Sequence, residues 1–141
     1  MISRLKQLEN YPTGDCQRTV FACLLGYDIP ERVPNFMEVA DNEETASRIF
    51  IENMNRWLET ERFNYIEISL EEFQRLTFIQ EGYCTVLGKS PRGDYNHIVI
   101  GKIVKENDDY NLYYEWDTSP YHDGKFIDGD IKAIGFLSRK L

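Results

Sequence analysis

The sequence predicts an α+β protein in which N-terminal helices pack on a C-terminal antiparallel sheet. Two observations lead to this class. Apolar residues recur with a helical period before residue 60, whereas most stretches beyond residue 63 alternate and are rich in Val, Ile and Tyr. Turn residues separate the later stretches at Gly93-Asp94 and at Asn107-Asp108-Asp109, as expected between hairpin strands. Segregation of helices from strands is typical of α+β domains.

The first helix is expected to run from Cys16 to about Leu25. Asp15 precedes it and belongs to the residue types that favour the N-cap position, and Gly26 supplies a C-terminal stop. Four apolar positions are expected to form one buried stripe: Cys16, Val20, Cys23 and Leu24. Cys16 is therefore expected in the first turn of a buried helix.

The remaining elements follow in order along the chain. An extended loop containing Pro30 and Pro34 is expected over residues 27–42, and a long helix from Glu43 to Thr60. Beyond it we expect strands at 63–68, 83–87, 97–104, 110–116 and 131–137, with a short helix at 70–76.

Composition narrows the classes of function. A chain of 141 residues predicts a single domain over residues 1–141. The net charge of −8, from 24 acidic and 16 scattered basic residues, argues against nucleic acid and permits a basic peptide partner. Without a secretory signal or an apolar membrane span, we expect a soluble, cytoplasmic protein with no membrane partner.

The three cysteines predict neither a disulfide framework nor a zinc site, because their number is odd and no CxxC spacing occurs. No metal or other cofactor is expected. A helix N-terminus favours the thiolate form of a cysteine, and Cys16 is the cysteine placed there. Cys23 and Cys84 are interpreted as small buried apolar residues.

A base for this thiol must come from one of two histidines. His97 opens an apolar strand and is the stronger candidate, whereas His122 lies in a turn-forming segment. His97 is alternatively a strand residue bonded to a backbone carbonyl. Asp117 closes the next strand, and pairing about residue 107 places it opposite His97, where it would fix the imidazole tautomer. Asp117 is alternatively a turn-initiating residue.

The acyl oxyanion of such a reaction requires hydrogen-bond donors. The Cys16 amide is one candidate, and the side chain of Asn10 is the second. Gln17 and Asn96 are weaker alternatives, and Asn10 is equally compatible with a structural role in a loop. Arg92 is interpreted as an exposed loop cation or as a contact for a substrate carboxylate.

The order Asn10-x4-Asp15-Cys16, then His97, then Asp117 resembles the papain-like cysteine peptidase superfamily, including the peptidase domains of bacteriocin exporters. The chain is also similar to small papain-like proteins of bacteriophages and bacteria, through Gly-Asp-Cys-x-Arg-Thr, Val-Pro-x-Phe, Ser-Pro-Arg-Gly and the His97 strand. The resemblance implies the papain-like fold and thiol acyl transfer. Asn10 stands where the exporter domains have Gln, and Gln17 where they often have Gly.

The leading hypothesis is a thiol-dependent peptidase or amidase that cleaves a peptide, isopeptide or related amide bond in a peptide or protein substrate. Its triad is Cys16, His97 and Asp117, and the reaction passes through a thioacyl intermediate. The alternative is a catalytically inactive papain-like binding protein, such as a phage-encoded inhibitor of a host protein. A third hypothesis, acyl transfer to an amine, uses the same residues.

Overall fold

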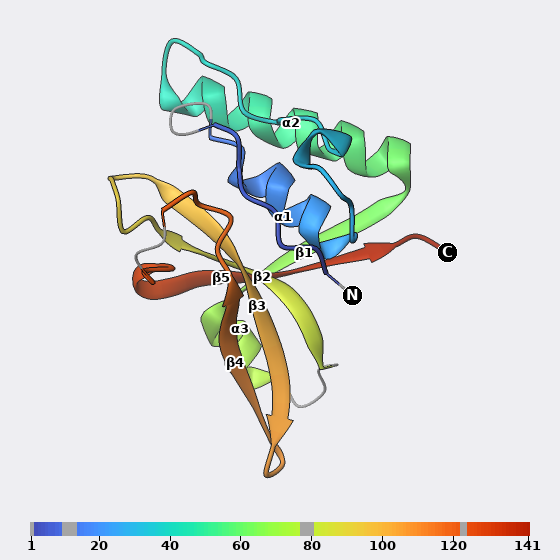
Figure 1. Cartoon of the computed structure of the whole chain (residues 1–141), viewed down its shortest axis with the longest axis vertical. Helices are drawn as coiled ribbons and strands as arrows, with labels where there is room; N and C mark the ends of the chain where they lie inside the picture. Colours follow the sequence, from blue (N-terminus) through green and yellow to red (C-terminus); the bar gives the residue numbers. More distant parts are fainter. Residues whose placement is uncertain (1, 10–13, 77–80, 122–123) are drawn as a thin grey trace. The chain divides into compact units, whose positions relative to one another are not determined.

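The computed structural model describes residues 2–9, 14–76, 81–121 and 124–141. Over these residues it is an α+β protein with three α-helices, one short 3₁₀ helix and five strands (Figure 1). The elements are α1 (Cys16–Leu24), η1 (Pro30–Arg32), α2 (Glu43–Glu61), β1 (Phe63–Ser69), α3 (Leu70–Arg75), β2 (Gly82–Lys89), β3 (Asn96–Glu106), β4 (Asp109–Trp116) and β5 (Asp128–Arg139). Each predicted helix and strand is therefore present, with ends shifted by at most a few residues.

The chain divides into two compact units. Unit 1 comprises Met1–Tyr65, Thr118–Pro120 and Leu137–Leu141, and unit 2 comprises Ile66–Asp117 and Tyr121–Phe136. Strands β1 and β5 contribute residues to both. The expectation of one domain over residues 1–141 stays a prediction, and each unit is described by itself below.

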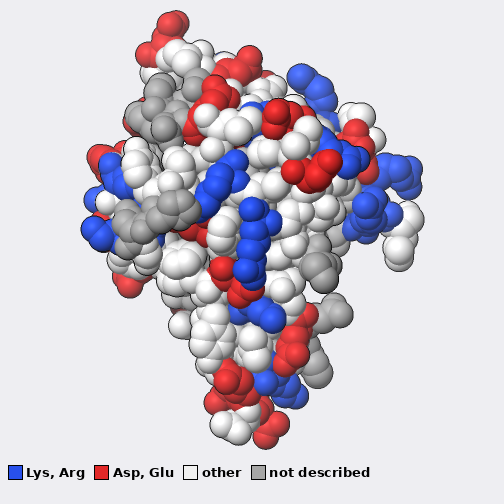
Figure 2. Space-filling view, viewed as in Figure 1, with Lys and Arg blue, Asp and Glu red and all other residues white. Residues whose placement is uncertain are grey.

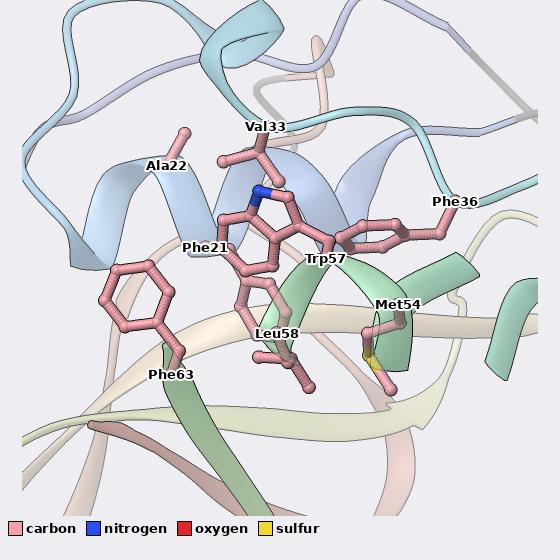
Figure 3. Close-up of a cluster of buried hydrophobic side chains, with 8 residues drawn as sticks. All are labelled: Phe21, Ala22, Val33, Phe36, Met54, Trp57, Leu58 and Phe63. Carbon is pink, nitrogen blue, oxygen red and sulfur yellow. The ribbon is translucent and has the colours of Figure 1, made fainter. Parts of the chain in front are cut away.

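Unit 1 is built around aromatic side chains from α1, α2 and the loop between them. Phe21 of α1 stacks on Trp57 of α2 with ring centroids 5.7 Å apart, and Trp57 stacks on Phe63 at 5.4 Å. Phe36, from the loop before α2, packs edge-on against Phe21. Figure 3 shows this cluster with Ala22, Val33, Met54 and Leu58 completing it. Burial of these large apolar surfaces holds the two helices together.

Helix α1 is buried over most of its circumference, so the predicted stripe is too narrow. Phe21 and Ala22 are fully buried although neither belongs to that stripe, whereas Leu24 is only partly buried. The helix ends as expected at Gly26, which adopts a positive φ of 72°. Its amide donates to the Cys23 carbonyl and the Tyr27 amide donates to the Ala22 carbonyl, which is a Schellman motif.

Unit 2 contains the antiparallel strands β2, β3 and β4, and the whole sheet has the order β1-β5-β2-β3-β4. Figure 1 shows β3 and β4 as a long hairpin. Its turn is Asn107-Asp108, and both residues have positive φ, as a two-residue type I′ turn requires. One hydrophobic cluster of this unit is formed by the buried residues Phe73, Cys84, Val86, Val99, Ile103 and Ile134.

Gly101 of β3 packs against side chains of both neighbouring strands, β2 and β4. A Cβ atom there would lie 2.7 Å from Val86 Cγ2 and 3.2 Å from Cys84 Sγ, so the strand has no room for a larger residue. Strand β3 is buried from His97 to Gly101, which makes it the most deeply buried strand of this unit. A side chain at its start is therefore held rigidly.

Within the described residues, no helix has the length and apolar character needed to cross a membrane. On the face drawn in Figure 2, Lys and Arg side chains are interspersed with Asp and Glu. This distribution agrees with the scatter of basic residues along the sequence.

Candidate functional site

Cys16 is the first residue of α1 and is partly exposed. Asp15 occupies the N-cap position, as predicted, but its side chain does not cap the helix, so the expected capping bond is wrong. Among the described residues, no side chain caps α1 and no acidic residue lies in its first turn. The first-turn amides are thus left to favour negative charge at Cys16.

The carboxylate of Asp15 instead binds the N-terminal segment. It accepts hydrogen bonds from the Leu8 amide at 2.9 Å, from the Glu9 amide at 2.9 Å and from Arg18 Nε at 3.0 Å. The Asp15 side chain is fully buried, and Arg18 is nearly so. Because an unpaired carboxylate is costly to bury, these partners explain why the Asp15 side chain turns away from the helix.

Gln17 follows Cys16 and is buried. Its Nε2 atom has no hydrogen-bond partner among the residues that the structure describes. Removing an amide donor from water without a partner costs about 1–3 kcal/mol. A buried donor of this kind calls for an explanation, since most are satisfied in folded proteins.

The other two thiols are expected to react slowly. Cys84 in β2 and Cys23 in α1 are fully buried. Burial raises the pKa of Cys84 to about 12, opposed by the Gly101 amide. Burial likewise raises the pKa of Cys23, opposed by the Leu5 amide. Neither forms thiolate readily near neutral pH, which leaves Cys16 as the candidate nucleophile.

In unit 2 the structure brings His97 and Asp117 together. His97 lies near the start of β3 and its side chain is 5% exposed. Its Nε2 atom is 2.7 Å from Asp117 Oδ1. Because a carboxylate can only accept, Nε2 is the donor and carries the proton in the neutral ring. The tautomer so fixed makes Nδ1 the basic nitrogen.

This contact does not arise from the predicted register. The observed turn is centred between Asn107 and Asp108 and not on residue 107, so Gly101 pairs with Tyr114, and a bulge then pairs Ile100 with Trp116. His97 therefore does not stand directly opposite Asp117 in the ladder. Asp117 lies just beyond the end of β4, where its side chain reaches the imidazole.

Arg92 differs from its interpretation as an exposed loop cation. Its side chain is only 16% exposed, and Nη2 lies 3.4 Å from Asp117 Oδ2. Asp117 thus interacts with His97 through one oxygen and with Arg92 through the other. The sequence indicates only weakly that Arg92 lies near the His97 site, through its position five residues before His97. Its contact with Asp117 depends on the pairing of β3 with β4.

Of the side chains considered as oxyanion donors, the structure describes Gln17 and Asn96 but not Asn10. Asn10 lies outside the described residues, as does the second histidine, His122. Asn96 Oδ1 accepts a hydrogen bond from Lys132 Nζ at 2.7 Å. Cys16 and Gln17 belong to unit 1, whereas His97, Asp117 and Asn96 belong to unit 2.

Comparison with protein-family models, with curated proteins and with solved structures finds no match. Over the described residues, no group of three or more His, Cys, Asp or Glu side chains is arranged to hold a metal ion. The functional argument therefore depends on the chemistry of the residues themselves.

Proposed function

We propose that this chain is a papain-like thiol hydrolase that cleaves a peptide, isopeptide or related amide bond. The observation that carries the proposal is the 2.7 Å contact between His97 Nε2 and Asp117 Oδ1 near the start of a buried strand. An imidazole so held has a fixed tautomer, as a catalytic base requires. The reactive thiol of the proposal is Cys16, because Cys23 and Cys84 are buried and their pKa values are raised.

In the proposed reaction, Nδ1 of His97 takes the proton of the Cys16 thiol, and the thiolate attacks the substrate carbonyl carbon. The carbon–nitrogen bond breaks, the imidazolium gives its proton to the leaving amine, and a thioester remains on Cys16. Water, deprotonated by His97, then attacks the thioester. The products are a carboxylic acid and the regenerated thiol. Asp117 orients the imidazole throughout.

Oxyanion stabilisation in this proposal begins with the backbone of α1. The Cys16 amide is the first donor, because its helix start has no side-chain cap among the described residues. Asn10 stays the predicted second donor. Gln17 is a competing donor, since its buried Nε2 has no partner among the described residues.

The proposal is tested by alkylation of the three cysteines with iodoacetamide at pH 7, followed by peptide mapping. We expect Cys16 to react at least about tenfold faster than a free thiol, because a neighbouring base raises the thiolate fraction. His97→Ala is expected to remove this acceleration. His122→Ala is the matched control, because it removes the other histidine of the chain and is expected to leave the rate unchanged.

Two outcomes would contradict the hydrolase. One is alkylation of Cys16 at the rate of a free thiol, and the other is acceleration that persists in the His97 variant. Either outcome would favour the alternative of an inactive papain-like binding protein. A substrate screen with the Cys16→Ala variant as the blank then identifies the amide bond that is cleaved.

A further inference from the structure

The loop before β3 holds Arg92 in a defined position. The Arg92 amide donates to Ser90 Oγ at 3.1 Å, and the Ser90 amide donates to the Tyr95 carbonyl at 2.8 Å. Ser90 is almost fully buried. Both hydrogen bonds lie within the loop and hold it in one conformation, which restricts where the guanidinium group is presented.

The guanidinium group contacts several other residues of unit 2. Nη2 lies 3.4 Å from Asp117 Oδ2, Nη1 donates to the Lys125 carbonyl at 3.4 Å, and the group lies over the Tyr121 ring, 5.5 Å from its centroid. A planar fork with several donors suits this arrangement, and the single ammonium of a lysine cannot reproduce it.

From this geometry we propose that Arg92 is a positioning residue for the His97–Asp117 pair, and this inference rests on the proposed function. Both carboxylate oxygens of Asp117 are contacted by donors, Oδ1 by His97 and Oδ2 by Arg92. Two donors on opposite oxygens oppose rotation of the carboxylate about its Cβ–Cγ bond. Arg92 thereby keeps Oδ1 directed at Nε2 and keeps the imidazole in the Nε2–H tautomer.

The role differs from a contact with substrate. Arg92 is largely buried and already engaged by Asp117, so it acts on the reaction through the orientation of the base. A wrong tautomer puts the proton on Nδ1, where the base can no longer accept one from a thiol. Losing Arg92 is therefore expected to lower the fraction of His97 competent for proton transfer without changing the thiol.

The test combines nitrogen NMR of the imidazole with the alkylation rate, both on the full chain. In the parent protein, at a pH where the ring is neutral, we expect the ¹⁵N shifts of His97 to report a single Nε2–H tautomer. Arg92→Met is expected to give a mixture of both tautomers and to slow alkylation of Cys16 about tenfold or more. Arg92→Lys keeps the charge and is expected to give an intermediate result.

Arg75→Met is the matched control, because Arg75 also pairs with a carboxylate, Glu71 at 2.6 Å, but both side chains are 74% exposed. It is expected to change neither reading. The positioning role is wrong if both Arg92→Met and Arg92→Lys keep the single tautomer and the parent rate of Cys16 alkylation. If Cys16 of the parent protein is alkylated no faster than a free thiol, the proposed function is wrong. The tautomer measurement still decides whether Arg92 orients the His97–Asp117 pair.

Discussion

The two longest helices begin in opposite ways, although a good capping residue precedes each. At α2, Asn42 Oδ1 accepts from the Thr45 amide at 2.8 Å, and Glu43 and Glu44 add negative charge to the first turn. At α1, the side chain of Asp15 leaves the helix and binds the N-terminal segment. The start of α2 is thus stabilised by its own residues, whereas the start of α1, which carries Cys16, has no such cap among the residues that the structure describes.

The two helix starts therefore differ in whether the preceding side chain occupies the first-turn amides. Capping residues satisfy the first-turn amides and contribute about 1 kcal/mol to stability. Where they are diverted, the amides and the helix dipole act on whatever approaches, here the thiol of Cys16 and, in the proposed reaction, an oxyanion. The burial of Asp15 is the structural cause of the diversion.

The largest expected change in stability comes from removing the Asp15 carboxylate, which binds the N-terminal segment instead of capping α1. Asp15→Ala removes the buried carboxylate that contacts Arg18 Nε at 3.0 Å and takes the acceptor from the amides of Leu8 and Glu9. We expect the free energy of unfolding to fall by about 3–5 kcal/mol, measured by urea denaturation. Asn42→Ala is the control for an ordinary cap, with an expected loss of about 1 kcal/mol. Equal losses in the two variants would mean that Asp15 is no more than a cap.

The thiols provide a second test, through alkaline pH. The folded-state pKa of Cys84 is about 12, raised by burial from an ordinary value of 9.0. Between these two values the Cys84 thiol loses its proton in the unfolded chain and keeps it in the folded chain. The free energy of unfolding is therefore unaffected by this thiol below about pH 9 and declines as the pH rises toward 12. The decline per thiol is at most about 1.4 kcal/mol per pH unit.

In Cys84→Ala we expect the free energy of unfolding to decline less steeply with pH, by up to about 1.4 kcal/mol per pH unit. The slope is measured by urea denaturation between pH 8 and 10. Burial also raises the pKa of Cys23, so part of the decline persists in that variant. The Glu106 hydrogen bond raises the pKa of Tyr113 and burial raises the pKa of Tyr114, so the part of the decline that these tyrosines cause near pH 10 also persists in the variant. An unchanged slope would show that the Cys84 thiol is accessible to solvent in the folded state.

The smallest expected effect concerns the residue next to the nucleophile. Gln17→Met removes a buried amide whose Nε2 has no partner among the described residues, and keeps a side chain of similar length. We expect stability to rise by about 1 kcal/mol in urea denaturation. Thr19→Val is the matched control, because Thr19 Oγ1 donates to the Asp15 carbonyl at 2.8 Å and its loss is expected to destabilise. A loss of stability in Gln17→Met would show that the amide is bonded in solution.

The order of elements was predictable because it depends on local patterns. Gly26 ended α1, Asn42 began α2, and Asn107-Asp108 formed the hairpin turn, each through backbone chemistry of neighbouring residues. The apolar stripe of α1 was predicted too narrow, because the loop carrying Val33 and Phe36 covers a further side of this helix. How much of a helix is buried depends on partners that are distant in sequence.

Turns, caps and periodicity act over a few residues, so the helix and strand order, the place of Cys16 at a helix start and the place of His97 near the start of a strand could be predicted from the sequence. Tertiary structure alone decided which groups bind Asp15 and Asp117. Those partners lie 3 to 25 residues away along the chain, and only the packed chain, with its shifted turn centre and its bulge at Ile100, brings their atoms within hydrogen-bond distance.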